Sequence, residues 1–311
     1  MTSRNSSAPQ LPPAIVAVLR CSVCATPLHP EGRSLRCARR HSFDIAKQGY
    51  VNLLHAKVAA GTADTSEMVA ARAEFLATGH YAPLVTLLAE AARDARGREE
   101  TPLIVDAGAG TGYYLAGVLD AVGGAGLALD VSAPALRRAA RTHPRLGAVV
   151  WNLWEPWPVA DGVADVVLNV FAPRNAAEFH RVLRPGGLLV VATPGPRHLH
   201  QLVDTLGLLD IAGDKSERLT EALAGRFDHV ATRSTSETAS LDADDVRALV
   251  LMGPNAHHLD RDGLGDRLRN LSGTMEVTTD FDVSVFRRTD GRPDETAGTP
   301  TTGSTATGRT S

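Results

Sequence analysis

Three cysteines and one histidine near the start of the chain have a spacing that suits a metal ion. They form the array Cys21-x2-Cys24-x12-Cys37-x3-His41, and the chain contains no cysteine outside it. Zinc is held tetrahedrally by four ligands of this kind, and two short knuckles can supply two ligands each. We therefore expect a small zinc ribbon.

The segment between the two knuckles contains a rival ligand for this site. Pro27, Pro30 and Gly32 predict a loop there, and His29, which lies in that loop, is a rival fourth ligand. A second alternative is that the three thiols are ordinary buried side chains. A four-ligand zinc site leaves no position for water or substrate. The ion is therefore expected to be structural, and the chemistry of the protein must lie elsewhere.

Residues 1–57, which contain the array, are basic. Eight Lys and Arg stand there against two acidic residues, a net charge of +6, whereas the whole chain has −3 and the remainder therefore −9. A basic module on an acidic body favours a polyanionic partner, with a merely solvated surface as the alternative. The residues expected to contact phosphates are Arg33, Arg36, Arg39 and Arg40.

Length and composition predict one large domain and a small one, because 311 residues that are 43% hydrophobic can bury such a core. Thiols used as metal ligands indicate a reducing compartment, so we expect a cytoplasmic protein. The apolar run 11–19 is too short to span a bilayer and lacks a signal-peptide cleavage site. From about Thr289 the sequence turns to Thr, Gly, Ser and Pro, which predicts a disordered tail.

Between about residues 65 and 205, apolar runs of strand length alternate with helical patterns. This is typical of the βαβ units of a doubly wound α/β sheet. Strands are expected over 103–107, 126–130, 148–152, 165–170 and 188–192. Helices are expected over 65–78 and 83–96, with further helix starts at Ser132 and near Arg174. The carboxyl ends of such parallel strands form the ligand crevice.

The residues that could bind a ligand in that crevice follow the first strand. The run Asp106-Ala-Gly108-Ala-Gly110-Thr111-Gly112 permits a tight turn and a close approach of the backbone to a ligand. Asp130, at the tip of the next strand, can accept hydrogen bonds from both hydroxyls of a ribose. Asp106 would repel a pyrophosphate but attract the ammonium group of S-adenosylmethionine. This difference favours a methyltransferase over a NAD-dependent enzyme.

Further motifs follow the zinc array in a fixed order. They are His41-Ser-Phe-Asp-Ile-Ala-Lys-Gln-Gly-Tyr-Val-Asn-Leu-Leu54, Ala70-Ala-Arg72, Thr78-Gly-His-Tyr-Ala-Pro-Leu84, Phe171-Ala-Pro173, Leu183-Arg-Pro-Gly-Gly187 and Ala192-Thr-Pro-Gly-Pro-Arg-His-Leu199. Over most of residues 18–287 this set resembles the RlmA family of 23S ribosomal RNA guanine-N1 methyltransferases. The run Asn169-Val-Phe-Ala-Pro-Arg-Asn175 is similar to the Gram-positive branch of that family.

The resemblance implies a Rossmann-like class I methyltransferase sheet with an N-terminal zinc ribbon. It implies methyl transfer from S-adenosylmethionine to N1 of guanosine 748 in hairpin 35, with resistance to tylosin- or mycinamicin-type macrolides. It places Tyr81, Thr111, Gly112 and His198 at the cofactor, and Asn169 facing the methyl group. Structural alternatives are a helix cap for Tyr81, a surface histidine for His198, and an amide that satisfies turn backbone for Asn169.

We therefore expect an RNA-binding ribbon over 1–57, a methyltransferase domain over 58–287 and a disordered tail over 288–311. Guanine N1 lies on the Watson–Crick edge, so the substrate base must be unpaired or extruded. Catalysis is then largely alignment of N1 with the S–CH3 bond. The sequence assigns no general base.

Two other functional classes compete with this interpretation. A small-molecule methyltransferase with a structural ribbon has no need of a basic module. A zinc-ribbon regulator that only senses a nucleotide has no need of Asp106 and Asp130 in ligand-reading positions. The expected partner is therefore 23S rRNA and not a membrane, and the sequence leaves a homodimer open.

Overall fold

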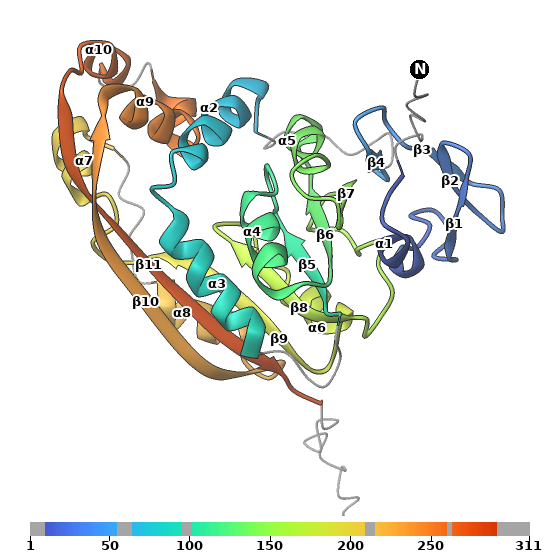
Figure 1. The fold of residues 1–311 in the computed structure, drawn as a ribbon. Helices are drawn as coiled ribbons and strands as arrows, with labels where there is room; N and C mark the ends of the chain where they lie inside the picture. The colour runs from blue at the N-terminus through green and yellow to red at the C-terminus, as the bar shows by residue number, and fades with distance from the viewer. Residues whose placement is uncertain (1–9, 55–63, 95–100, 209–214, 260–262, 291–311) are drawn as a thin grey trace, which may run out of the picture.

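A mixed sheet of eight strands, in the order β10-β11-β9-β8-β5-β6-β7-β4, forms the centre of the protein (Figure 1). The computed structural model describes residues 10–54, 64–94, 101–208, 215–259 and 263–290. The five central strands are parallel and comprise β5 (Leu103–Ala107), β6 (Ala125–Asp130), β7 (Leu146–Val150), β8 (Ala164–Val170) and β9 (Leu183–Pro194). The expected Rossmann-like α/β class is confirmed, and the strand order reverses at β5, beside β8.

Both edges of the sheet contain strands that the sequence did not predict. At one edge, β10 (Phe227–Asp242) and β11 (Thr274–Arg288) form a long antiparallel hairpin, and β11 pairs antiparallel with β9. Between these two strands the chain forms α9 (Ala243–Leu251), η1 (Pro254–His258) and α10 (Leu264–Arg269). At the other edge, β4 (Tyr50–Asn52) pairs parallel with β7. The predicted boundary at residue 57 and the tail from residue 291 lie outside the described residues.

Helices cover both faces of the sheet. One face is packed by α2 (Ser66–Ala77), α3 (Ala82–Asp94), α4 (Tyr113–Val122) and α5 (Ala133–Ala139), together with α7 (His200–Leu206), and the other by α6 (Ala176–Val182) and α8 (Lys215–Leu223). Ser132 caps α5, as predicted, by accepting from the backbone of Ala135. Among the described helices, none is both long enough and apolar enough to cross a membrane.

The N-terminal ribbon consists of α1 (Pro13–Val18) and the antiparallel strands β1 (Leu28–Glu31), β2 (Ser34–Cys37) and β3 (Ser42–Asp44). The prediction of a loop around Pro27, Pro30 and Gly32 was wrong, because this segment forms most of a hairpin. Gly32 takes a positive φ in its two-residue turn, which the strand twist favours. Pro30 is tolerated because β1 is an edge strand, and Pro27 immediately precedes that strand.

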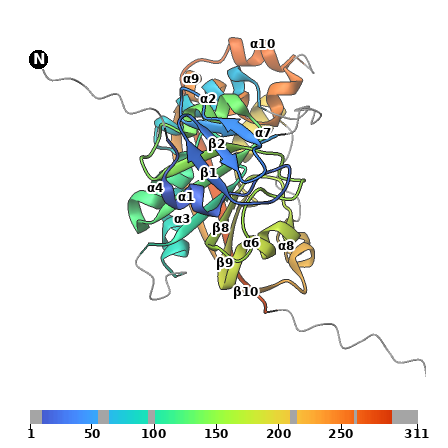
Figure 2. The same ribbon diagram turned by 90° about the vertical axis from the view of Figure 1, so that its right-hand side faces the viewer.

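Helix α1 covers a part of the sheet that the chain leaves open between β7 and β8. Residues 151–163 connect these two strands without a helix, and Figure 2 shows α1 in front of the sheet. The backbone amide of Ala160 donates to Val18 (2.9 Å), and that of Arg20 donates to Pro158 (2.8 Å). A Cβ on Gly147 would lie only 2.7 Å from Ile15 Cγ2. The ribbon and the sheet therefore share one core.

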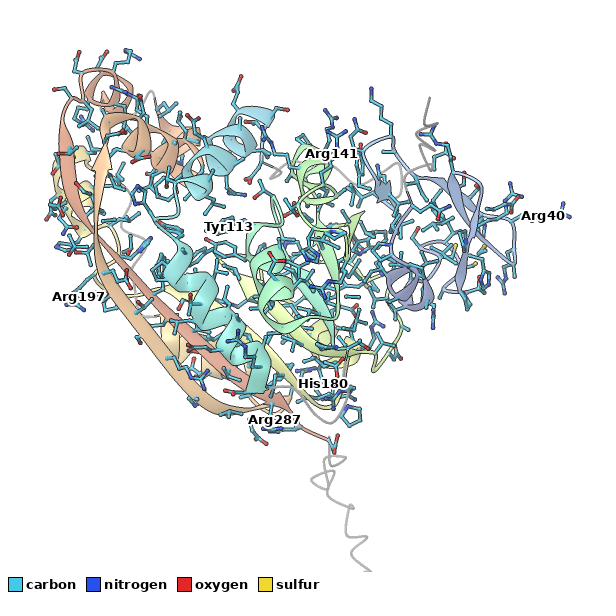
Figure 3. All side chains as sticks on the ribbon, in the orientation of Figure 1. Arg40, Tyr113, Arg141, His180, Arg197 and Arg287 are labelled. Atoms are coloured by element: carbon cyan, nitrogen blue, oxygen red, sulfur yellow. The ribbon has the colours of Figure 1, made fainter. Side chains whose placement is uncertain are left out.

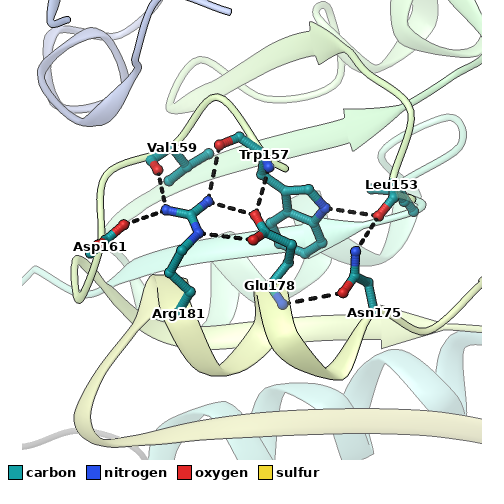
Figure 4. Close-up of polar contacts among 7 residues, drawn as sticks. All are labelled: Leu153, Trp157, Val159, Asp161, Asn175, Glu178 and Arg181. Atoms are coloured by element: carbon teal, nitrogen blue, oxygen red, sulfur yellow. Dashed lines mark hydrogen bonds and ion pairs between the residues drawn. The ribbon is translucent and has the colours of Figure 1, made fainter. Parts of the chain in front are cut away.

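Helix α6 fixes the same helix-free connection from the other side (Figure 4). Glu178 accepts from the backbone amide of Trp157 (2.6 Å), and Arg181 donates to the carbonyls of Trp157 (3.0 Å) and Val159 (2.7 Å). Asn175 donates to the carbonyl of Leu153 (3.0 Å). Buried hydrogen bonds to charged groups hold irregular backbone firmly, so Leu153 is held in place beside the crevice described below.

Candidate zinc centre and cofactor crevice

The four residues of the zinc array converge in the ribbon. His41 Nδ1 lies 3.5 Å from Cys21 Sγ and 3.4 Å from Cys37 Sγ, and the sulfurs of Cys24 and Cys37 are 3.7 Å apart. All four ligand atoms lie within 4.8 Å of one another. Around a tetrahedral zinc with Zn–S bonds of about 2.3 Å, neighbouring sulfurs are about 3.8 Å apart. The cluster therefore has the dimensions of a closed zinc site.

The surroundings of the cluster agree with a structural ion. His29, the rival ligand, is exposed on β1 and is not a member of the cluster. The Thr26 hydroxyl lies 3.1 Å from Cys24 Sγ and lowers the pKa of that thiol to about 7. A lower pKa favours the thiolate, which is the form that binds metal. With four protein ligands no coordination position is left for a substrate.

The glycine-rich run forms the turn between β5 and α4, and it lies where the strand order reverses. Gly108, Gly110 and Gly112 all have positive φ values. A Cβ on Gly108 would lie 2.3 Å from the Cβ of Ala172, which follows β8, so only glycine fits there. The turn thus packs against the end of the neighbouring strand, where doubly wound sheets bind their ligands. Thr111, within the turn, is buried.

Asp106 and Asp130 lie at this turn, but in different states. Asp130 accepts from the backbone amides of Gly110 (2.9 Å) and Ser132 (2.8 Å), one on each carboxylate oxygen. Asp106 is buried, and its Oδ1 has no hydrogen-bond partner among the described residues. Burial, and then the charge of Asp130, raises the pKa of Asp106 to about 8. A buried acceptor without a donor is costly, and the ammonium group of S-adenosylmethionine would satisfy it.

Tyr81 and His198 form a hydrogen-bonded pair beside Phe281. The Tyr81 hydroxyl is 3.1 Å from His198 Nε2, and the amide of Asp280 donates to His198 Nδ1 (3.2 Å). Because Nδ1 accepts, the neutral ring carries its proton on Nε2 and donates it to the Tyr81 oxygen. The Tyr81 hydroxyl proton then remains to be donated. Both side chains make defined tertiary contacts, and their contact with the cofactor stays a prediction.

Asn169, at the end of β8, combines the two roles weighed from the sequence. Its Nδ2 donates to the carbonyls of Ala107 (3.2 Å) and Pro173 (3.0 Å), so the amide does satisfy turn backbone. Its Oδ1 is buried and has no hydrogen-bond partner among the described residues. Asn169 therefore ties the ends of β5 and β8 together and keeps one acceptor for a ligand.

Two side chains at the crevice were not predicted as site residues, although both lie in motifs visible in the sequence. Phe171 has a φ of +52° and is 43% exposed; its ring centroid lies 5.8 Å from that of Phe281 and 6.3 Å from that of Tyr114. A positive φ is an outlier for so bulky a residue and often marks a functional site.

The second of these side chains, Arg72, lies over the glycine turn. Its Nη1 is 3.3 Å from where a Cβ on Gly110 would be. The guanidinium forms an ion pair with Asp64 and donates to the carbonyl of Met252 (2.7 Å). Arg72 therefore connects α2 to the end of α9 directly above the turn.

Comparison with known proteins identifies the two halves of this arrangement separately. Residues 19–58 match the family model described as RlmA, N-terminal, a zinc ribbon, and residues 104–187 match a methyltransferase domain model. A 23S rRNA (guanine(748)-N(1))-methyltransferase from Streptomyces fradiae is 49% identical over 88% of this chain and 98% of its own length. The chain belongs to the RlmA family of 23S rRNA guanine-N1 methyltransferases.

A second relative agrees with that assignment. A protein from Micromonospora griseorubida, provisionally named as a 23S rRNA (guanine-N1)-methyltransferase, is 48% identical over 88% of this chain and 99% of its own length. A solved structure of geranyl diphosphate methyltransferase in complex with S-adenosylmethionine is 17% identical, covers 65% of this chain and 85% of its own, and has a TM-score of 0.38. As an RlmA-family enzyme, the protein uses S-adenosylmethionine as methyl donor, and its ribbon binds a structural zinc ion.

Proposed function

We propose that this RlmA-family enzyme methylates N1 of guanosine 748 in hairpin 35 of 23S rRNA, in the cytoplasm, and thereby confers tolerance to tylosin- and mycinamicin-type macrolides. The name of the Streptomyces fradiae relative supports the target. The observation that carries the proposal is the composition of the crevice. Two buried oxygens, on Asp106 and Asn169, have no donor among the described residues and lie at strand ends beside the exposed ring of Phe171.

Each of these groups has a role in methyl transfer. S-adenosylmethionine supplies an electrophilic methyl group on a sulfonium. Asp106 holds the ammonium end of the cofactor, and Asp130 the ribose. Phe171 offers its exposed face to a flat base, and base–aromatic stacking contributes about 1–3 kcal/mol. Asn169 Oδ1 accepts from the exocyclic amine on the donor edge of guanine, which leaves N1 open to the methyl group, and the N1 proton passes to water. These contacts align N1 with the methyl group, and alignment is the main catalytic effect expected.

The ribbon over residues 1–57 is proposed to bind the RNA. Arg33, Arg39 and Arg40 are exposed, and none has an acidic partner among the described residues. Arg36 is also exposed, but it forms an ion pair with Glu31 (2.6 Å). The methyltransferase domain, proposed over 58–287, then receives the base that the ribbon presents. A homodimer stays a prediction, and sedimentation velocity would test it.

Primer extension on 23S rRNA tests the target. An N1-methylated guanine cannot pair, so reverse transcriptase should stop one nucleotide before position 748 in RNA from cells that express the protein. The matched control is Asp106→Asn, which keeps the shape of the buried side chain and removes the charge that binds the cofactor. The stop should vanish in this variant, and so should tylosin tolerance in a host whose ribosomes lack the mark.

The outcomes separate the alternatives. A stop at another guanine would keep the enzyme class and refute the target. Absence of any stop, together with methyl transfer to a metabolite, would refute the RNA proposal and favour a small-molecule methyltransferase.

A further inference from the structure

A groove between α2 and α5 carries three arginines beside the cofactor crevice. It has a volume of about 500 Å³ and is lined by Ser66, Val69, Arg137, Arg138, Arg141 and Thr142, among others. The three arginine side chains are exposed. Within the described part of the chain, no carboxylate forms an ion pair with any of them. Three positive charges therefore line one open groove without compensation.

The groove lies between the ribbon and the methyl-transfer site. At one side, Thr142 Oγ1 would be 3.1 Å from a Cβ on Gly112, in the cofactor turn. At the other side, Ala140 Cβ would be 3.7 Å from a Cβ on Gly49, which immediately precedes β4. In Figure 1, α5 lies between α2 and β4. Figure 3 shows Arg141 at the end of α5, between Arg40 on the outer ribbon and Tyr113 at the start of α4.

Stabilisation of α5 explains only part of this arrangement. Arg137 and Arg138 lie in the last turn of α5, where cations interact favourably with the helix dipole. One cation would suffice for that role, and two adjacent ones repel each other. Arg141 lies beyond the end of the helix. The facing wall on α2 contributes Ser66 and Val69 and no acid, so the groove as a whole attracts anions.

We propose that this groove binds the phosphate backbone of the RNA substrate on its path from the ribbon to the crevice. This inference rests on the proposed function. An extended polyanion fits better than a small anion, because the three arginines are spread along an open groove, over the last turn of α5 and past its end. The Ser66 hydroxyl can donate to a phosphate, and Val69 offers apolar surface to a sugar.

The test compares two triple variants of the full-length, zinc-loaded protein. Arg137→Gln, Arg138→Gln and Arg141→Gln are combined in the first. The matched control combines Arg226→Gln, Arg269→Gln and Arg287→Gln, which remove the same charge from exposed positions outside the groove; Figure 3 shows Arg287 far from Arg141. The Kd for a hairpin 35 RNA is measured by fluorescence anisotropy across a KCl series, and the Kd for S-adenosylmethionine by calorimetry.

The groove variant should bind the RNA at least tenfold more weakly at low salt. Its slope of log Kd against log salt should fall by about 2, since each phosphate contact in single-stranded RNA contributes about 0.7. Cofactor affinity should stay at the wild-type value, and the control should keep the wild-type slope. A wild-type slope in the groove variant would overturn the inference.

Other outcomes are equally decisive. Loss of affinity for inorganic phosphate with unchanged RNA binding would make the groove a small-anion site and overturn the RNA path. A lower melting temperature with unchanged RNA binding would reduce the arginines to helix stabilisers. If the wild-type protein itself neither binds nor methylates the RNA, the proposed function fails, which is a different result from failure of the groove variant alone.

Discussion

Two of the regions that bury polar side chains differ in how those side chains are paired: the zinc centre in the ribbon, and the crevice at the ends of β5, β6 and β8. In the ribbon, four ligand atoms lie within 4.8 Å of one another and face each other. In the crevice, the buried oxygens of Asp106 and Asn169 have no donor among the described residues. The first arrangement is typical of a site that holds a fold together. In the second, buried acceptors without donors are unfavourable until a ligand donates hydrogen bonds to them, as is often the case at functional sites.

Among the variants that test this comparison, one that loses the metal should show the largest effect, which we expect on protein stability. Cys24→Ser should abolish zinc binding, and zinc binding contributes about 10–16 kcal/mol in isolated ribbon-like peptides. Because Cys21 and Cys37 belong to the same core as β5, β6 and β7, we expect one lowered unfolding transition for the whole protein. Metal analysis and scanning calorimetry would measure both effects. Val23→Ser, at an exposed neighbouring position, is the control; unchanged zinc content in Cys24→Ser would remove Cys24 from the ligand set.

Asp106→Asn should weaken cofactor binding without loss of stability, the opposite of the loss of stability expected at the zinc centre. The variant should bind S-adenosylmethionine roughly tenfold to a hundredfold more weakly, because a charged hydrogen bond contributes about 1.5–3 kcal/mol. The cofactor-free variant should be at least as stable as the wild type at pH 8, since it no longer buries a carboxylate. Calorimetric titration tests the cofactor affinity, and thermal melts test the stability of the cofactor-free protein. Wild-type cofactor affinity would exclude Asp106 from the site.

Phe171 tests whether the exposed ring serves the base or the fold. Phe171→Ala should lower kcat/KM for RNA by tenfold or more, because stacking contributes about 1–3 kcal/mol, while the affinity for the cofactor stays unchanged. Phe171→Tyr keeps an aromatic face and should retain most of the activity. Methyl transfer to a hairpin RNA is the assay. Equal loss in both variants would point to the strained backbone and not to stacking.

The pKa of Asp106 predicts how cofactor binding depends on pH. Binding of an ammonium group requires the carboxylate, and with a pKa of about 8 the group is mostly protonated in the cofactor-free protein at neutral pH. Affinity should therefore rise from pH 6 to pH 8, by at most about tenfold per pH unit. The stability of the cofactor-free protein should fall over the same range, because the unfolded state has the lower pKa. Asp106→Asn should flatten both dependences.

The ribbon arginines should give the smallest effect. Replacing Arg33, Arg39 and Arg40 by Gln should weaken RNA binding a few-fold and flatten its salt dependence, because the contacts are exposed and additive. Arg36→Gln is the internal control. Its charge is already engaged by Glu31, so its effect should be smaller than that of any of the other three. Anisotropy titrations at several salt concentrations would rank the variants. If the slope of log Kd against log salt equals the wild-type slope in all of them, the phosphate contacts lie elsewhere.

The central strands and the zinc array were predictable because each depends on local pattern. Continuous apolar runs such as Leu188–Ala192 indicate buried parallel strands wherever they occur, and spacing alone marks the knuckles. The hairpin β10–β11 was missed because its outer strand is largely exposed and polar, so it lacks the apolar signal. β4 was missed because it is only three residues long and its ladder is with β7, a contact distant in sequence.

The crevice was predictable in part. Asp106, Asp130 and the glycines follow strands, so their position was implied by the fold. Phe171 and Arg72 were visible as motif residues, but their roles depend on a strained φ and on packing over the turn. Such properties have no sequence signal. The arginine groove was missed for a similar reason, because its two walls come from α2 and α5 and meet only in the folded protein.

The pairing of β4 with β7 also sets an order of events during synthesis. The zinc ligands are complete once residue 41 is made, but the partner of β4 ends at Val150, about a hundred residues later. At roughly 5–20 residues per second, the ribbon waits on the order of 5–20 s for the strand on which it docks. During that interval the metal is what holds the ribbon together. In a cell short of zinc the ribbon would lack that support during the interval, so zinc supply would govern the yield of enzyme before it governs any activity.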